Sequence, residues 1–217
     1  MEEKNMKRGI YERYIKRMLD IVCSLVFLLL FWWVYAVIAV LVRMKLGSPV
    51  LFKQPRPGKD GKIFNMYKFR TMTDERDTQG DLLPDEVRLT RFGACLRSLS
   101  LDEIPEIWLI FMGKMSIIGP RPLLPAYLSR YNTHQSRRHE VRPGLTGYAQ
   151  VHGRNTVTWE EKFDMDVWYV DHITFWGDVK ILIDTVKTVF KREGISSQTS
   201  VTMEEFRGTP LEQSIHQ

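Results

Sequence analysis

The residue types best suited to chemistry occur in residues 98–107, SLSLDEIPEI, where the neighbouring carboxylates Asp102 and Glu103 precede a proline. Pro105 fits only the first turn of a helix, because further along it would remove a backbone hydrogen bond. The spacing therefore predicts Asp102 and Glu103 at a helix N-terminus, where free N–H groups and the helix dipole stabilise negative charge. Acidic residues at helix starts are also ordinary caps, so this segment alone leaves catalysis and capping both open.

Four arginines near this segment, or in glycine- and proline-rich segments after it, favour phosphate chemistry. They are Arg97, Arg121 in GPRP (119–122), Arg142 in RPGLTG (142–147) and Arg154 in GRN (153–155). Arginine side chains bind phosphate oxygens with two parallel hydrogen bonds. Two carboxylates among several arginines suit Mg²⁺-assisted phosphoryl transfer, and a carboxylate can also attack phosphorus and form an acyl phosphate.

A long apolar segment precedes this chemistry. Residues 21–42 contain no charged side chain, and roughly 20 apolar residues suffice to cross a bilayer. Lysines and arginines are frequent on both sides of the segment, whereas a straight crossing needs an excess on one side. A segment that enters one leaflet and leaves by the same face would satisfy this pattern. A single straight span is the main alternative, and a buried soluble helix or a cleaved signal peptide fits the pattern less well.

Composition limits the classes of partner. The formal net charge is +5 at pH 7, which favours anionic partners such as phospholipid or nucleotide. Nucleic-acid binding is not indicated, because the basic residues are spread along the chain without a recognised motif. The two cysteines, Cys23 and Cys95, form neither a disulfide framework nor a metal-ligand pattern, which suits a reducing compartment.

The remaining pattern predicts the elements that must position the site. Two short strands over 49–54 and 62–69 are joined by a hairpin signal at Asp60-Gly61. A polar segment, 71–88, is expected to be a long loop. Helices are expected over 90–99, 103–112, 158–170 and 178–193, with a short strand at 116–118 and a poorly ordered tail at 195–217. The last helix is amphipathic, so it would lie either on an anionic membrane surface or against the core.

A run of motifs in order identifies the chain as similar to the bacterial sugar transferases, specifically the small monotopic phosphoglycosyl transferases. The motifs are QPRPG (54–58), KIFNMYKFRTM (62–72), RSLSLDEIPE (97–106), MSIIGPRPLLPAYL (115–128), VRPGLTGYAQVHGRN (141–155) and KFDMDVWYV (162–170). The resemblance implies an α+β, mostly helical monotopic membrane protein. Its parts would be a re-entrant membrane helix in 1–45, a compact cytosolic catalytic domain in 46–194 and a C-terminal tail in 195–217. The catalytic domain would carry amphipathic surface helices and a small β-hairpin.

The resemblance also implies a reaction. A UDP-sugar, expected to be N-acetylated, would donate its sugar 1-phosphate to undecaprenyl phosphate and release UMP by a ping-pong mechanism. Asp102 would be the nucleophile and Glu103 its partner, with Mg²⁺ at this pair. Lys68, Arg97, Arg121 and Arg154 would hold phosphates or the nucleotide.

The same resemblance implies the surroundings of the enzyme. It places the protein in the bacterial inner (cytoplasmic) membrane, in contact with phospholipid, with the catalytic domain facing the cytoplasm and a homodimer as one possible assembly. Where family members often carry Ser-Pro at the break in the membrane helix, this chain has Trp32-Trp33. A re-entrant helix here would therefore lack the usual cause of a sharp kink. The alternative function is that of a non-catalytic scaffold that binds anionic lipid at the membrane surface.

Overall fold

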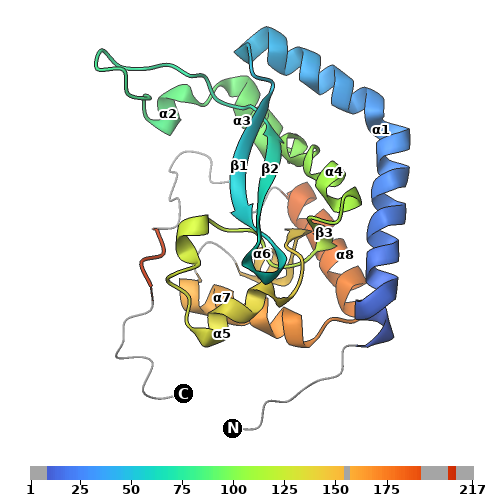
Figure 1. Ribbon diagram of the computed structural model, residues 1–217. Helices are drawn as coiled ribbons and strands as arrows, with labels where there is room; N and C mark the ends of the chain where they lie inside the picture. Colours follow the sequence, from blue (N-terminus) through green and yellow to red (C-terminus); the bar gives the residue numbers. More distant parts are fainter. Residues whose placement is uncertain (1–8, 154–156, 192–204, 209–217) are drawn as a thin grey trace.

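The computed structural model describes residues 9–153, 157–191 and 205–208, and it is mostly helical with two small sheets (Figure 1). The main helices are α1 (Lys16–Leu46), α3 (Arg91–Ser98), α4 (Glu106–Phe111), α7 (Trp159–Asp171) and α8 (Phe175–Lys191). Shorter helices are α2 (Asp85–Arg88), α5 (Thr133–Ser136) and α6 (Tyr148–His152). The expected mostly helical α+β architecture is therefore confirmed.

Most of the predicted elements are present, and their local signals explain them. Thr90 begins α3 by accepting a hydrogen bond from the Gly93 amide, and Thr158 with Glu161 forms the capping box of α7. The prediction that Asp178 begins the last helix is wrong, because α8 starts at Phe175 and Asp178 lies buried inside it. The end predicted for this helix, near 193, and nearly all of the 195–217 tail lie outside the described residues.

The predicted hairpin consists of β1 (Leu51–Pro57) and β2 (Ile63–Phe69), which pair in antiparallel register from Leu51 opposite Phe69 to Pro57 opposite Ile63. Asp60 has a φ of 56° in the turn, a conformation that Asp tolerates better than most residues. The hairpin carries Lys68, near the end of β2, towards the turn that follows α3. The segment after it is not entirely irregular, since it includes α2 and an isolated bridge between Met72 and Leu89.

A second sheet brings two distant proline-containing segments together. β3 (Ser116–Ile118) and β4 (Gly144–Thr146) are parallel, with Ser116 beside Gly144 and Ile118 beside Thr146. The backbones approach so closely that a Cβ at Gly144 would lie 2.1 Å from the Gly119 nitrogen. Only glycine fits there, and this contact fixes the loop that carries Arg121.

Helix α1 bends sharply part-way along its length, so that its second half turns across the rest of the molecule (Figure 1). The chain has no proline here, but two side chains bond to helix carbonyls. Ser24 Oγ donates to the Asp20 carbonyl at 2.6 Å, and Trp33 Nε1 donates to the Leu30 carbonyl at 3.1 Å. Side-chain bonds of this kind often accompany helix bending.

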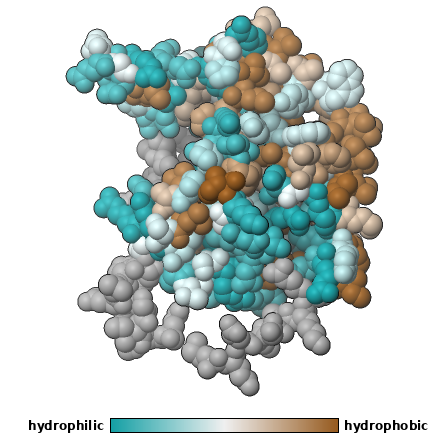
Figure 2. Space-filling model, in the orientation of Figure 1, coloured by the Kyte–Doolittle hydropathy of each residue, from teal (hydrophilic) through white to brown (hydrophobic). Residues whose placement is uncertain are grey.

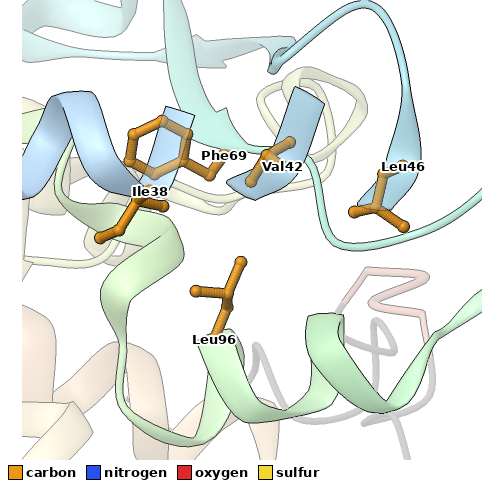
Figure 3. Packing of buried hydrophobic residues seen from close by; sticks show 5 residues of the cluster. All are labelled: Ile38, Val42, Leu46, Phe69 and Leu96. Atoms are coloured by element: carbon orange, nitrogen blue, oxygen red, sulfur yellow. The ribbon is translucent and has the colours of Figure 1, made fainter. Parts of the chain in front are cut away.

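Both ends of α1 pack on the same folded unit. Near its start, Arg17 donates to the carbonyls of Ile110 and Phe111 in α4. Near its end, apolar residues of α1 pack against Phe69 of β2 and Leu96 of α3 (Figure 3). These α1 residues are Ile38, Val42 and Leu46.

The middle of α1 differs from its ends because five consecutive large apolar side chains are exposed there. Leu29, Leu30, Phe31, Trp32 and Trp33 are all exposed. Brown, hydrophobic surface gathers on the side of the molecule where α1 runs (Figure 2). The helix over Tyr11–Leu46 is long and apolar enough to cross a membrane, and this exposed surface is compatible with association with lipid.

Candidate active site

The two predicted carboxylates lie on a separate 3-10 turn, η3 (Leu101–Glu103), rather than in the first turn of α4. Ser100 enters this turn with a φ of 53°, and Pro105 immediately precedes α4. The prediction that both acids occupy the helix N-terminus is therefore wrong in detail. Pro105 lacks an amide hydrogen, and the chain forms its tight turn before α4 rather than within it.

Glu103 is held by two cations from distant parts of the chain. Its Oε1 atom accepts hydrogen bonds from Lys68 Nζ at 2.5 Å and from Arg121 Nη2 at 2.7 Å. Burial alone would raise the pKa of Glu103, but Arg121 and Lys68 overcome that effect and lower it to about 2. Glu103 is therefore an anion at any physiological pH, and it fixes both cations beside Asp102.

Asp102 has the opposite environment. Its side chain is buried, yet its carboxylate makes no hydrogen bond or ion pair with another residue among those described. Burial raises the pKa of Asp102 above its ordinary value, while the charge of nearby Lys68 opposes the rise. An unpaired, partly desolvated carboxylate beside two cations has the properties of a nucleophile for a phosphate ester.

A third carboxylate, Glu106, belongs to the site and was not singled out from the sequence. It is buried in the first turn of α4, and its Oε1 atom lies 3.3 Å from Lys68 Nζ. Burial raises the pKa of Glu106 to about 7, against the opposing charge of Lys68. Its position in the motif DEIPE, one residue after Pro105, was the available signal, because the first turn of that helix faces back towards Asp102 and Glu103.

A buried ion pair positions Arg121. Arg138 Nη2 donates to Asp166 Oδ2 at 2.7 Å and to the backbone carbonyl of Arg121 at 2.8 Å. Both charged side chains are almost completely buried. The pair thus fixes the backbone from which the Arg121 side chain reaches Glu103, and Asp166 lies in the predicted motif KFDMDVWYV, where no role had been given to it.

The other predicted cations have different outcomes. Arg97 Nε donates to Thr71 Oγ1 at 3.0 Å rather than to Glu103, although its charge is close enough to lower the pKa of Asp102. Arg142 lies elsewhere, with Nε bonded to the Gly113 carbonyl at 2.9 Å after the end of α4. Arg154 lies outside the described residues.

The side chains of this site fit Mg²⁺ only if substrate phosphates supply the other ligands of the ion. No group of three or more His, Cys, Asp or Glu side chains suited to a metal occurs in the described part of the chain. Asp102 offers a carboxylate that is unpaired among the described residues, and Glu103 retains its Oε2 atom because Lys68 and Arg121 both donate to Oε1. Mg²⁺ is commonly bound by one or two carboxylates together with substrate phosphates, so these two residues fit that role.

Comparison with known proteins agrees with this geometry. The model of the family "Bacterial sugar transferase" matches residues 11–192. The chain belongs to the bacterial sugar transferase family. This membership covers α1, the hairpin, the carboxylate turn and Arg121 in one continuous match, and it confirms both the resemblance inferred from the motifs and the prediction of a transferase enzyme.

Individual members of the bacterial sugar transferase family extend the comparison. The uncharacterized sugar transferase EpsL of Bacillus subtilis is 51% identical over 195 residues, covering 90% of this chain and 96% of the relative. The undecaprenyl-phosphate galactose phosphotransferase of Salmonella typhimurium is 33% identical over 202 residues, covering 84% of this chain but 42% of the relative. A UDP-N-acetylgalactosamine-undecaprenyl-phosphate N-acetylgalactosaminephosphotransferase of Aeromonas hydrophila is 34% identical, covering 81% of this chain and 44% of the relative. The chain thus spans nearly all of one relative and less than half of the other two.

Proposed function

We propose that this bacterial sugar transferase moves a sugar 1-phosphate from a UDP-sugar to undecaprenyl phosphate and releases UMP. The names of the Salmonella and Aeromonas relatives specify transfer of a sugar phosphate to undecaprenyl phosphate. The site offers what such a transfer needs, a free carboxylate beside fixed cations. The observation that carries the proposal is a contrast between neighbours. Asp102 is unpaired among the described residues, whereas Glu103 holds Lys68 and Arg121.

In the first half-reaction, an Asp102 carboxylate oxygen attacks the phosphorus that bears the sugar. The new oxygen–phosphorus bond forms as the phosphoanhydride breaks, and UMP leaves with the bridging oxygen and its electron pair. In the second half-reaction, a phosphate oxygen of undecaprenyl phosphate attacks the same phosphorus and displaces the Asp102 carboxylate. One phosphoanhydride replaces another, so the exchange needs no further energy source.

The neighbouring residues bind and orient the phosphates during both steps. Lys68 and Arg121 are fixed by Glu103 and can stabilise the negative charge that develops on the transferred phosphoryl group. Arg97 and Arg154 are proposed to contact the phosphates or the nucleotide. Asp102 and Glu103 would hold Mg²⁺, which supplies charge neutralisation of the substrate phosphates when bound.

We further propose that α1 is re-entrant and that the protein is monotopic. A straight helix of 31 residues would be about 46 Å long, and its two ends would lie on opposite sides of a bilayer. Instead, residues near both ends of α1 contact one folded unit, through Arg17 and through Val42. The exposed apolar residues between them would then lie deepest in the lipid.

Several expectations complete this proposal. The site would face the cytoplasm from the inner membrane of a bacterium, and the catalytic unit would comprise residues 46–194 with α1 as its anchor. An N-acetylated sugar and a homodimer stay predictions. The relatives named above differ in their sugars, galactose in one and N-acetylgalactosamine in the other.

The test is UMP release by the purified chain with Mg²⁺, undecaprenyl phosphate and a panel of UDP-sugars. Asp102→Asn should reduce release by at least about a thousandfold, because an amide cannot act as the anionic nucleophile. Asp81→Asn, a change at an exposed acid in the 71–88 segment, is the matched control and should leave release unchanged. Excess EDTA should stop the reaction and added Mg²⁺ should restore it. An active Asp102→Asn protein would exclude Asp102 as the nucleophile. Absence of UMP release with every sugar would favour the scaffold alternative.

A further inference from the structure

A charged cavity of about 360 Å³ lies away from the carboxylate turn. Its lining includes five cationic side chains from three parts of the chain: Arg13, Lys16, Arg17, Lys59 and Arg142. Three carboxylates, Glu12, Asp20 and Glu140, also line it, which leaves an excess of two positive charges. This volume falls within the range of about 300–1,000 Å³ that is typical of small-ligand sites.

The cavity is separate from the proposed active site. Arg17 and Arg142, which line it, bond to the carbonyls of Ile110 and Gly113 at the end of α4. Asp102 precedes the beginning of the same helix. The two sites therefore lie at opposite ends of α4.

The acids of the cavity already have partners. Asp20 Oδ1 accepts hydrogen bonds from the Ile117 amide at 2.9 Å and from Ser116 Oγ at 3.1 Å. Glu140 pairs with Arg137 at 3.1 Å. The donors to Asp20 are neutral and leave its charge in place, but the five cations of the lining outnumber all three acids. An excess of two positive charges therefore remains for an anion from outside the chain.

Two of the cations have no such partner. Lys16 is paired with Asp178 at 2.7 Å, and Arg17 and Arg142 bind backbone carbonyls. The side chains of Arg13 and Lys59 make no hydrogen bond or ion pair with any residue in the ranges described above. Arg13 lies in the π-helical segment Tyr11–Ile15 that runs into α1, and Lys59 lies in the hairpin turn. Two separate elements therefore contribute free positive charge to the lining of one cavity.

We propose that this cavity binds the phosphodiester of an anionic phospholipid head group. The inference rests on the membrane placement proposed above, because the cavity lies where the apolar helix begins and hence at the level of lipid head groups. Among the residues that the structure describes, no aromatic side chain lines the cavity for a nucleobase to stack on. A bound head group would hold the start of α1 at the membrane surface, at a fixed height relative to the active site.

The test uses the full chain in detergent micelles, titrated with dihexanoyl-phosphatidylglycerol and, separately, with inorganic phosphate, while its melting temperature is followed. A ligand that binds the folded state raises that temperature. The lipid should raise it at concentrations that inorganic phosphate does not match. In Arg13→Gln/Lys59→Gln, lipid binding should be about thirtyfold weaker, since each cation near a lipid surface contributes about fivefold.

Matched variants separate this site from general charge effects. Lys53→Gln/Arg91→Gln removes two exposed cations outside the cavity and should bind like the parent chain. Arg13→Lys/Lys59→Arg keeps both charges and should also bind. An equal response to inorganic phosphate would overturn the lipid assignment in favour of a free anion, and undiminished binding by the glutamine variant would overturn the site. Asp102→Asn should bind the lipid normally, so failure here is distinguishable from failure of the proposed reaction.

Discussion

Lys68 Nζ lies 2.5 Å from Glu103 Oε1, and this contact joins a hairpin strand to the turn that carries the proposed nucleophile. The two residues are 35 positions apart in the chain. Because Lys68 also lies 3.3 Å from Glu106 Oε1, one ammonium group is shared between the half-buried Glu103 and the buried Glu106. This arrangement leaves Asp102 as the carboxylate of the segment that is free to react.

Replacing Glu103 by glutamine tests that division of roles. The change removes the negative charge that holds Lys68 and Arg121, so both cations lose their fixed position beside Asp102. We expect turnover to fall about a hundredfold, within the range for loss of one positioned catalytic group. UMP release measures this, with Glu75→Gln as a control at an exposed acid. A Glu103→Gln enzyme as fast as its parent would refute the positioning role.

Glu106 should make stability depend on pH in a direction that is unusual for an acid. Its pKa is raised by burial to about 7 from the ordinary 4.5, so the folded chain binds this proton more tightly than the unfolded chain does. The associated stability is fully present below pH 4.5 and is lost as pH rises through 7. Glu106→Gln should therefore gain stability relative to the parent between pH 4.5 and 8, by on the order of 3 kcal/mol.

Urea unfolding of both proteins at several pH values measures this gain. Taking the difference between variant and parent cancels the other titrating groups to a first approximation. A difference that does not change between pH 4.5 and 8 would show that Glu106 has an ordinary pKa.

Features that depend on residues close together in the sequence were predicted correctly, whereas features that depend on tertiary contacts were not. Local signals were reliable: the Thr90 cap, the Thr158–Glu161 capping box and the Asp60-Gly61 turn all lie where expected. The predicted start of the last helix, at Asp178, was wrong, although Asp178 is a good N-cap residue by local rules. Tertiary contacts override those rules, since Asp178 instead accepts hydrogen bonds from Lys16 and Tyr11 at the other end of the chain.

The site shows the same limit. The motifs identified Asp102, Glu103, Lys68 and Arg121, but no spacing rule states that Glu103 would hold both cations and leave Asp102 unpaired. Arg97 had an equally suitable residue type, yet it bonds to Thr71. Such pairings depend on how the hairpin, the turn and the Gly119–Gly144 contact meet in space.

The buried pair of Arg138 and Asp166 should be important for stability as well as for the site. Asp166→Asn leaves the Arg138 guanidinium buried without a counter-charge, which costs about 3–5 kcal/mol. Asp164→Asn is a close control, because Asp164 is two residues away and its side chain is 64% exposed in its contact with His134. Its unfolding free energy should change by less than about 0.5 kcal/mol. Equal effects of the two substitutions on the unfolding free energy would contradict a stabilising role for the Arg138–Asp166 pair.

The bend in α1 leads to a prediction about topology. The test uses a background in which Cys23 and Cys95 are replaced by serine. Single cysteines are then introduced at Ile10, which precedes α1 in the sequence, and at Lys62, which follows it; both positions are exposed. If α1 is re-entrant, a membrane-impermeant maleimide will label both positions from the same face of sealed inverted vesicles. It will label neither in vesicles of the opposite orientation.

A cysteine at Leu30, in the exposed middle of α1, is the depth control. It should resist the reagent from both faces, because the apex of a re-entrant helix lies within lipid. Labelling of Ile10→Cys and Lys62→Cys from opposite faces would show a straight span instead. The packing of Arg17 on α4 and of Val42 beside Phe69 would then have to break in the membrane. Since those contacts hold both ends of the helix on one folded unit, we expect labelling from one face.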